Sequence, residues 1–486
     1  SANLPAAGKQ QVIKGYLLIA AATALYGFYL YVTGDYNRLT SAFYWANPCA
    51  AFLLPAFLIG GWRWITGRRW LPALQVLCIG TAFWLTDSRG AVLAAGVILA
   101  SCLAVPAVRR RAGWIVMVGA VTFVVSLGLV QIKAQVAGQS TLVPGSRFAE
   151  AASGESTSVR DRLNYLGSAV QIWKDHPLTG TGAGTFGTVH PGYQQRVISA
   201  ANDPHSLLAA TLAEQGLIGV LILVYLGTVL AWGMWRGVRR EPRLGVIAVS
   251  AVVLALHFCL DIDARYPALV VLLALLVGLT YQPWRHRPVP PARRLILPAA
   301  LLAALVIGVS GYLSDTQVQQ GRIHDENHDL ALAAAAYGKA HSGVVYNPDA
   351  WTAEGIDYYT LAALTGGSKH YLPMVRDRAR QAIRRDPYDS QHYFLLGRVE
   401  RLEGHPDAAV QAYRQALRFD HLNHPEYYAD LGGVLLQQGD AVAARRVIET
   451  GLELYPEAVM RNRSTDPRIK PAITELKRLQ AALPPL

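Results

Sequence analysis

The groups that could handle a charged substrate concentrate in one polar stretch, residues 160–205. Arg160 and Arg162 open an amphipathic segment, and His205 ends the stretch just before an apolar helix. A guanidinium group can bind two phosphate oxygens at once, and an imidazole can act as a general base near neutral pH. A helix N-terminus favours a neutral imidazole and also a nearby anion. Together these residues predict chemistry on a phosphorylated substrate.

Simpler interpretations of the same residues stay open. Either arginine could belong to a charged helix start that lies on a membrane surface. A lone histidine is more often structural than catalytic. Ser206 directly follows His205 and could cap the helix that begins there.

Three further arginines stand alone in short loops between apolar segments. They are Arg38 in GDYNRLT, Arg89 in TDSRGA and Arg265 in DIDARYP. An arginine at a membrane boundary can anchor a helix by reaching toward the interface. Charge is otherwise sparse in these loops, and we therefore favour a phosphate-binding role, most of all for Arg89.

Two short motifs need more context. Gly182 and Gly184, in LTGTGAGTF, predict a tight turn that lets backbone approach a phosphate or a sugar. They do not predict a dinucleotide site, which requires a preceding strand. Asp261 and Asp263 form an Asp-x-Asp pair that could hold a divalent metal, but the pair is too short to be specific, and a polar loop is the favoured interpretation.

The elements that must position these residues are apolar helices. About 20 apolar residues span a bilayer as a helix. We expect about nine spans, with ends uncertain by a few residues: 16–33, 46–61, 71–86, 90–106, 114–132, 207–232, 244–260, 267–281 and 295–313.

Composition agrees with a membrane protein. The chain of 486 residues is 52% hydrophobic and 16% charged, whereas soluble proteins average about 25% charged residues. The net charge of +12 does not indicate a nucleic-acid partner, because most basic residues before the tail lie in short loops, where they set topology. The richer set of loops holds Lys9, Lys14, Arg63, Arg68, Arg69, Arg109, Arg110, Arg111, Arg236, Arg239, Arg240, Arg243, Arg285, Arg287, Arg293 and Arg294.

The charge pattern predicts orientation. Loops rich in Lys and Arg face the cytoplasm, so the polar loop 131–205 and the whole C-terminal region are expected outside it, in the periplasm of a bacterium with two membranes. No ATP or sugar nucleotide is found there. Group transfer must then use a donor that already carries its activation, such as a lipid diphosphate.

The C-terminal region repeats. Leu396, Gly397, Gly404, Ala409 and Ala416 recur 35 residues later as Leu431, Gly432, Gly439, Ala444 and Gly451. This spacing is close to the 34-residue period of tetratricopeptide helix pairs, which build a surface that can hold a peptide or partner. The segments 379–387 and 331–340 resemble second helices of earlier units. A bracing role for the array stays open.

Four stretches resemble the O-antigen ligase and polymerase superfamily, which includes the protein O-oligosaccharyltransferases. They are RLTSAFYWANPCAAFLL, TDSRGA, RLNYLGSAVQIWKDHPLTGTGAGTF and HSLLAATLAEQGLIG. The last two are the most specific, and the resemblance covers about residues 38–281. Ser206 departs from the pattern, because Asn is commoner there. Family members tend to have more spans before the first motif, so helices preceding Ser1 are expected.

The resemblance implies that the membrane domain, expected at residues 1–313, is an all-α, C-type glycosyltransferase bundle. The repeat and the charge pattern predict that residues 314–486 form an extracytoplasmic helical repeat domain. The resemblance also implies an inverting, metal-independent enzyme without cofactors, which leaves Asp261 and Asp263 as loop residues. The donor would be an undecaprenyl-diphosphate-linked glycan. Arg89 and Arg162 would contact the diphosphate, and His205 would activate the acceptor or orient the diphosphate; Arg38, Arg160, Arg265, Gly182, Gly184 and Ser206 are the expected substrate-binding residues.

The acceptor stays open. A lipid acceptor makes an O-antigen ligase, a growing glycan makes an O-antigen or exopolysaccharide polymerase, and a protein makes a protein O-oligosaccharyltransferase. Besides glycan, acceptor and membrane lipids, a protein partner could bind the repeat domain. The alternative of another class is a non-enzymatic polysaccharide transporter or assembly scaffold. A transporter should carry charges near mid-membrane, and His257 is the main ionisable group well inside a predicted span.

Overall fold

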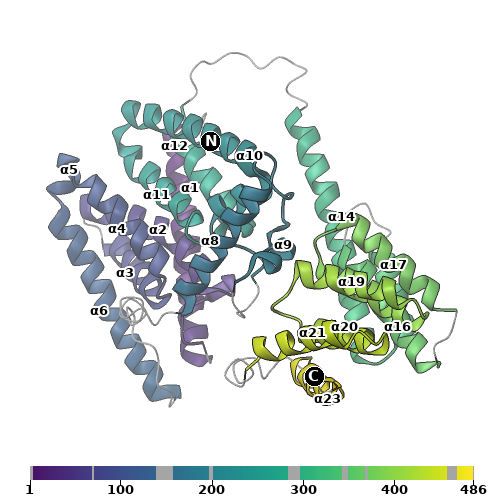
Figure 1. Ribbon diagram of the computed structural model, residues 1–486. Helices are drawn as coiled ribbons and strands as arrows, with labels where there is room; N and C mark the ends of the chain where they lie inside the picture. Colours follow the sequence, from purple (N-terminus) through teal and green to yellow (C-terminus); the bar gives the residue numbers. More distant parts are fainter. Residues whose placement is uncertain are drawn as a thin grey trace. The chain divides into compact units, whose positions relative to one another are not determined.

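The computed structural model describes residues 4–34, 36–67, 70–137, 157–195, 201–282, 296–341, 348–366, 370–456 and 468–484. All regular elements in these ranges are helical, as expected (Figure 1). Parts of the predicted catalytic loop, residues 138–156 and 196–200, lie outside them, as do Arg68, Arg69, Arg285, Arg287, Arg293 and Arg294 of the predicted cytoplasmic loops.

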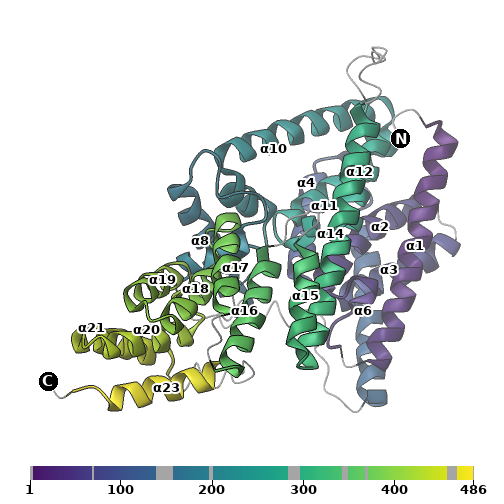
Figure 2. The ribbon, with the colours of Figure 1, turned by 90° about the vertical axis from the view of Figure 1, so that its right-hand side faces the viewer.

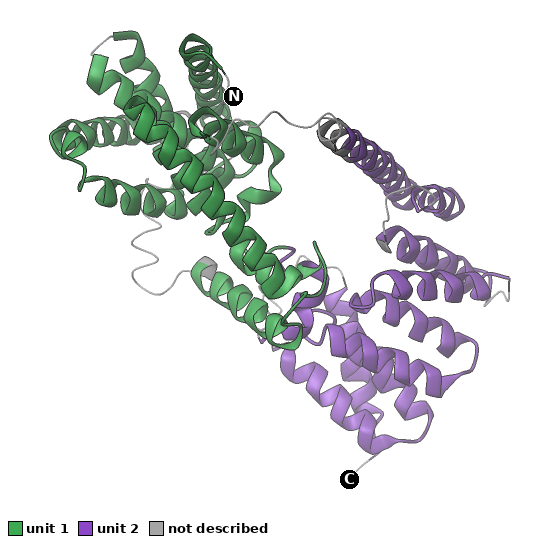
Figure 3. Cartoon of the chain, turned by 90° about the horizontal axis from the view of Figure 1, so that it is seen from above, with its two compact units in different colours: residues 1–186, 203–286 green, residues 187–202, 287–486 purple. Residues whose placement is uncertain are grey.

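The chain divides into two compact units (Figure 3). Unit 1 comprises Ser1–Phe186 and Asp203–His286, and unit 2 comprises Gly187–Asn202 and Arg287–Leu486. The chain therefore leaves unit 1 at the end of the glycine-rich turn and returns two residues before His205. The expected domain limits, 1–313 and 314–486, stay a prediction, and one helix, α14, continues through residue 313.

Unit 1 is a bundle of apolar helices. Each predicted span that falls in it coincides with one helix: α1 Ala6–Thr33, α2 Ala46–Gly67, α3 Trp70–Leu85, α4 Arg89–Cys102, α6 Ala112–Ala137, α10 Leu207–Arg240, α11 Gly245–Phe258 and α12 Pro267–Thr280. By length and composition, four stretches are able to cross a membrane, Ala6–Thr33, Ala46–Gly67, Ala112–Gln135 and Leu207–Arg240; the other four helices are apolar but shorter. The helices α5 Pro106–Arg109, α8 Thr157–Asp175 and α9 Phe186–Tyr193 lie between these segments in the chain.

Small residues let the helices of unit 1 approach closely. Ala20 and Ala24 of α1 and Ala50 of α2 are fully buried in one apolar core with Leu53 and Ile79. Helices in lipid associate through such close packing, because lipid tails are as apolar as leucine. By contrast, Leu221, Val224 and Tyr225 of α10 are exposed in unit 1, as expected of side chains that face lipid.

Helix α10 contains a break that the sequence analysis did not predict. Gly216 has φ 62° and ψ −157°, so its backbone is not helical. The amides of Leu217 and Ile218 donate to the carbonyls of Pro177 and Leu178 at 2.9 and 3.2 Å. In a continuous helix these two amides would donate to carbonyls of the preceding turn. Here they donate to the connection that follows α8, so the predicted span 207–232 consists of two helical segments.

Unit 2 is a stack of helix pairs (Figure 2). Its helices are α14 Ile296–Glu326, α15 Leu330–Ala340, α16 Pro348–Leu364, α17 Leu372–Arg385, α18 Ser390–Leu402, α19 Pro406–Phe419, α20 Pro425–Gln437, α21 Ala441–Leu454 and α23 Ile469–Ala481. The predicted repeat is confirmed as the pairs α18–α19 and α20–α21. A side-chain carbon on Gly397 would lie 2.5 Å from Tyr413, and one on Gly432 would lie 2.7 Å from Ile448, so the recurring glycines allow each pair to pack.

The segment Gly187–Asn202 belongs to unit 2, and its described residues contact the end of α19 and the connection that follows it. The side-chain amide of Asn423, between α19 and α20, donates to Oε1 of Gln194 at 3.0 Å, and both residues are buried. The backbone of Gly192 lies against the carbonyls of Arg418 and Phe419. His190 of α9 is fully buried, and this burial lowers its pKa to about 4, so it is neutral at physiological pH.

Candidate active site

Asp261, three residues after the end of α11, is the centre of a polar cluster in unit 1. Its side chain is 2% exposed. Arg162 of α8 donates from Nη2 to Oδ2 at 2.6 Å, and Nδ1 of His205 lies 3.4 Å from Oδ1. The backbone amide of Ile262 adds a hydrogen bond to Oδ1 at 2.9 Å. The two residues predicted to be catalytic in the polar stretch therefore meet at one carboxylate.

The environment of Asp261 keeps it ionised. Burial by itself raises the pKa of this carboxyl group, since a charge is poorly solvated away from water. The hydrogen bond with His205, the positive charge of Arg162 and the amide of Ile262 outweigh burial and hold the pKa well below its usual range. A buried, ionised acid is thus available to orient Arg162 and His205.

Arg38 joins the cluster through Asn47, at the start of α2. The Asn47 amide donates to Oδ2 of Asp261 at 2.6 Å, and Nη2 of Arg38 donates to Oδ1 of Asn47 at 2.6 Å. Arg38 also donates from Nε to the carbonyl of Thr86 at 2.7 Å. Asn47 therefore links Arg38 to the carboxylate that binds Arg162.

Arg89 starts α4 beside this network. Ser88 caps the helix by accepting from the amide of Ala91 at 3.4 Å. Nη2 of Arg38 lies 3.3 Å from the carbonyl of Asp87, two residues before Arg89. Arg89 itself is half-buried. The Ser-Arg-Gly motif and Arg38 thus occupy the same end of the bundle.

His205 is held by contacts on both sides. Its backbone amide donates to Oδ1 of Asp203 at 2.7 Å, and its φ of 56° is unusual for a residue other than glycine. The ring stacks on Tyr165 of α8, with centroids 5.9 Å apart and planes 16° from parallel. Ser206 is the N-cap of α10, accepting from the amide of Ala209 at 3.3 Å, as expected. This local turn fixes the direction in which the imidazole points.

Arg265 lies at the edge of the same site. Its Nε donates to Oδ2 of Asp203 at 2.6 Å, and it is about half exposed. Asp203 also accepts from the backbone amide of His205. Arg265 is therefore linked to the backbone of His205 through Asp203.

The glycine-rich turn at Gly182 and Gly184 binds the side chain of Glu214. The amide of Gly184 donates to Oε2 of Glu214 at 2.8 Å, and the amide of Phe186 donates to Oε1 at 3.1 Å. The amide of Gly182 donates to the backbone carbonyl of Glu214 at 2.8 Å. The turn has the positive φ angles that the glycines predicted, 115° at Gly182 and 78° at Gly184. Its amides stabilise the broken helix α10, and a substrate contact of Gly182 or Gly184 stays a prediction.

Gly182 and Gly184 are not part of the Asp261 cluster, and neither is Arg160. Arg160 is exposed on α8, and its charge acts on the neighbouring Asp161. Burial raises the pKa of Asp161, while Arg160 and His205 partly offset this. The structure thus distinguishes two arginines that the sequence presented alike.

Asp261 and Asp263 lie in the polar loop between α11 and α12, the interpretation favoured from the sequence. Both are buried, and Asp263 is paired with the equally buried His257 of α11. Asn47 and Glu214 were missed as contact residues. The signal for Asp261 was present, since its loop holds two acids beside Arg265, whereas GDYNRLT and TDSRGA each hold one acid and one arginine.

Residues 73–224 match a family model described as O-antigen ligase. Arg89, Arg162 and His205 lie within the matched range, and Arg38 and Asp261 lie outside it. The match indicates a membrane glycosyltransferase of the ligase and polymerase superfamily.

Other comparisons add little. No curated protein matches the chain. A solved structure titled crystal structure of MamA is 15% identical and covers 33% of this chain and 95% of its own, with a TM-score of 0.25. A second, of MamA AMB-1, is 16% identical and covers 35% and 90%, also with a TM-score of 0.25. The repeat architecture of unit 2 therefore rests on its own helix pairs.

Proposed function

Starting from an O-antigen ligase domain at residues 73–224, we propose that the protein transfers a glycan from an undecaprenyl-diphosphate-linked donor to an acceptor hydroxyl outside the cytoplasm. The enzyme resides in the inner membrane, with unit 2 in the periplasm. Transfer inverts the anomeric centre and requires no metal ion.

One observation carries the proposal. Arg162 and His205 meet at the buried carboxylate of Asp261, and Arg38 joins them through Asn47. These residues come from four separate stretches of the chain. A purely structural ion pair would not need an arginine, a histidine and a second arginine gathered on one acid at the end of a membrane bundle.

The reaction needs charge stabilisation at the leaving group. When the acceptor oxygen attacks the first carbon of the sugar, the bond to the diphosphate breaks and negative charge grows on the phosphate oxygens. Arg162 and Arg89 stabilise that charge, which is the largest contribution in many such reactions. Asp261 holds Arg162 in place with a 2.6 Å hydrogen bond, so little reorganisation is needed.

The acceptor hydroxyl must also lose its proton. In the proposed step the Nδ1–H of His205 donates to Oδ1 of Asp261, and Nε2 accepts the proton from the acceptor. The carboxylate orients the ring and stabilises the imidazolium that forms, as in other acid–histidine pairs. Tyr165 restricts rotation of the ring by stacking on it.

Arg162→Ala and His205→Ala test these assignments. Removing one charge-stabilising donor is expected to lower transfer roughly 10²–10³-fold, and removing the base roughly 10²–10⁴-fold. The assay follows transfer from a lipid-linked donor in purified membranes, with the protein level measured in parallel.

Lys174→Ala is the matched control, because it removes an exposed positive charge from the same helix, α8. Transfer at the wild-type rate in both site variants would exclude this active site. An equal loss of transfer in Lys174→Ala would mean that transfer depends on the total positive charge of α8 and not on Arg162 itself.

The acceptor is identified by deleting the gene in its host and separating surface glycans and glycoproteins on a gel. Lost long-chain lipopolysaccharide identifies a ligase. Single-repeat chains identify a polymerase, and unglycosylated protein identifies a protein oligosaccharyltransferase. In each case the repeat helices of unit 2 would hold the acceptor or an assembly partner.

A further inference from the structure

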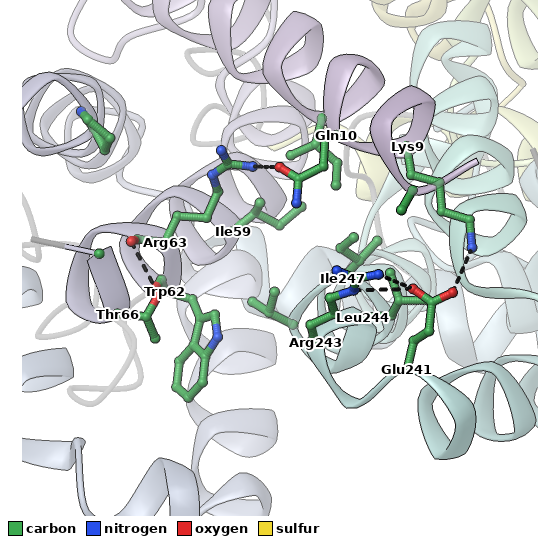
Figure 4. Close-up of a pocket in the computed structure, with 15 residues that line it drawn as sticks. Lys9, Gln10, Ile59, Trp62, Arg63, Thr66, Glu241, Arg243, Leu244 and Ile247 are labelled. Carbon is green, nitrogen blue, oxygen red and sulfur yellow. Dashed lines mark hydrogen bonds and ion pairs between the residues drawn. The ribbon is translucent and has the colours of Figure 1, made fainter. Parts of the chain in front are cut away.

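A second polar site lies at the other end of unit 1. The Asp261 cluster uses the starts of α2 and α10 and the end of α11. A cavity of about 480 Å³ instead lies between the start of α1, the end of α2 and the segment joining α10 to α11 (Figure 4). Helix α2 alone has 22 residues, or about 33 Å at 1.5 Å per residue, which is close to the thickness of a bilayer core.

The rim of this cavity is positively charged. Lys9, Arg63 and Arg243 line it together with a single acid, Glu241. The three cations come from α1, α2 and the turn Pro242–Leu244, and they carry two more charges than Glu241 balances. The same end holds the loops that the charge pattern predicts to be cytoplasmic, where anionic lipids concentrate.

The existing contacts of these cations are loose. Nζ of Lys9 lies 3.8 Å from Oε1 of Glu241, beyond hydrogen-bond distance, although the lysine side chain is only 12% exposed. Nη1 of Arg63 reaches Oε1 of Gln10 at 3.4 Å, and Arg243, 63% exposed, reaches Oε2 of Glu241 at 3.2 Å. Figure 4 draws Lys9 and Arg243 approaching Glu241 from opposite sides. An incoming phosphate could replace such long contacts with shorter ones.

The rest of the lining is apolar. Ile13, Ile59 and Ile247 line the cavity, and Trp62 lies at the end of α2 beside Arg63. A tryptophan and basic residues at the end of spanning helices are typical of the membrane interface. A soluble anion would make no favourable contact with these apolar side chains. A phospholipid can bind its phosphate to the cations and pack its glycerol and first methylenes against the isoleucines.

We propose that this cavity binds the headgroup of an anionic phospholipid, with Lys9, Arg63 and Arg243 contacting the phosphate. The lipid would join α1, α2 and the α10–α11 turn at the membrane face opposite the Asp261 cluster. The site does not depend on the chemistry proposed for Asp261, so either proposal can fail alone.

The test measures thermal unfolding of the full chain in neutral detergent during titration with dioctanoyl phosphatidylglycerol. We expect a saturable rise in Tm. Dioctanoyl phosphatidylcholine, glycerol 1-phosphate and inorganic phosphate, each at the same concentration, are expected to give no comparable rise. An equal rise with phosphatidylcholine would overturn the role of charge, and an equal rise with phosphate would overturn the lipid.

Variants locate the effect. Lys9→Gln with Arg63→Gln should weaken phosphatidylglycerol binding about 25-fold, at about fivefold per charge. Arg110→Gln is the matched control, since it removes an exposed charge from the same predicted face outside the cavity. Equal weakening by the control would show a diffuse surface effect and refute the site.

Glu241→Gln removes the anion that competes for Lys9 and Arg243. It should tighten binding, a gain that misfolding cannot imitate. Unchanged or weaker binding in this variant, together with unchanged binding in Arg243→Gln, would refute the site even if the double variant failed to fold.

Discussion

Asp261 connects residues that are far apart in the chain. It lies 99 positions from Arg162 and 56 from His205, and the Asn47 amide reaches it across 214 positions. A buried carboxylate with three polar side-chain partners is costly to disturb, because any partner left alone is a buried, unsatisfied group. We infer that Asp261 positions the arginine and the histidine rather than contacting the sugar.

Asp261→Asn should therefore lower transfer roughly 10²-fold or more while the protein stays folded. The amide is nearly the same size and keeps an oxygen that can accept from Asn47, but it carries no charge for Arg162. Transfer and thermal unfolding are measured together. Asp175→Asn, an exposed acid at the end of α8, is the control. Wild-type transfer in Asp261→Asn would remove Asp261 from the mechanism.

At the scale of elements, the break in α10 determines where His205 sits. Gly216 is placed so that an added side-chain carbon would lie 2.5 Å from the backbone carbon of Leu178, and Gly180 would meet the backbone of Glu214 at 2.2 Å. Neither backbone atom can move aside as a flexible side chain could. The turn and the helix therefore fit together only with glycine at both positions.

Gly216→Ala should destabilise the protein by about 1–3 kcal/mol, because alanine is strained at φ 62° and has no room beside Leu178. Transfer should fall as well, since the first segment of α10 carries His205. Gly227→Ala, on the same helix with open space around it, should be neutral or slightly stabilising. Thermal unfolding and transfer of both variants check this, and equal stability of the two would contradict a fixed break at Gly216.

At the scale of the whole molecule, both units bury acids among their helices. In unit 1 these include Asp261 and Asp263, and in unit 2 they include Asp357. Asp357 of α16 is 3% exposed and faces Asp325 at the end of α14, which in turn accepts from Tyr337 at 2.7 Å. Burial, followed by the hydrogen bond and the negative charge of Asp325, raises the pKa of Asp357 far above its usual range.

This arrangement predicts a pH dependence. A group whose pKa is higher in the folded state stabilises that state fully below its unfolded pKa, about 4, and the contribution is lost as pH rises through the folded pKa. Hydrogen exchange of α15 and α16 should therefore accelerate in excess of its intrinsic rate from neutral to alkaline pH. Asp357→Asn should remove this trend, and Asp377→Asn, an exposed acid on α17, should keep it. The same trend in all three proteins would contradict the raised pKa.

The sequence by itself determined the helices, the repeat and the motif residues. Apolar runs and glycine spacing are local signals, and local hydrogen bonding is what makes a helix, so the spans matched helices and the 35-residue shift matched helix pairs. The sequence also singled out Arg38, Arg89, Arg162 and His205 by type and place.

Only the tertiary structure decided which of these groups share a carboxylate. Asp261 reads as one acid in a polar loop until α2, α8 and the start of α10 surround it, and Arg160 looks like Arg162 until the helix faces are known. Likewise, only the structure shows that the amides of the glycine turn bind Glu214, about 30 residues away. Such pairings depend on how helices from distant parts of the chain pack, which no local pattern of residues encodes.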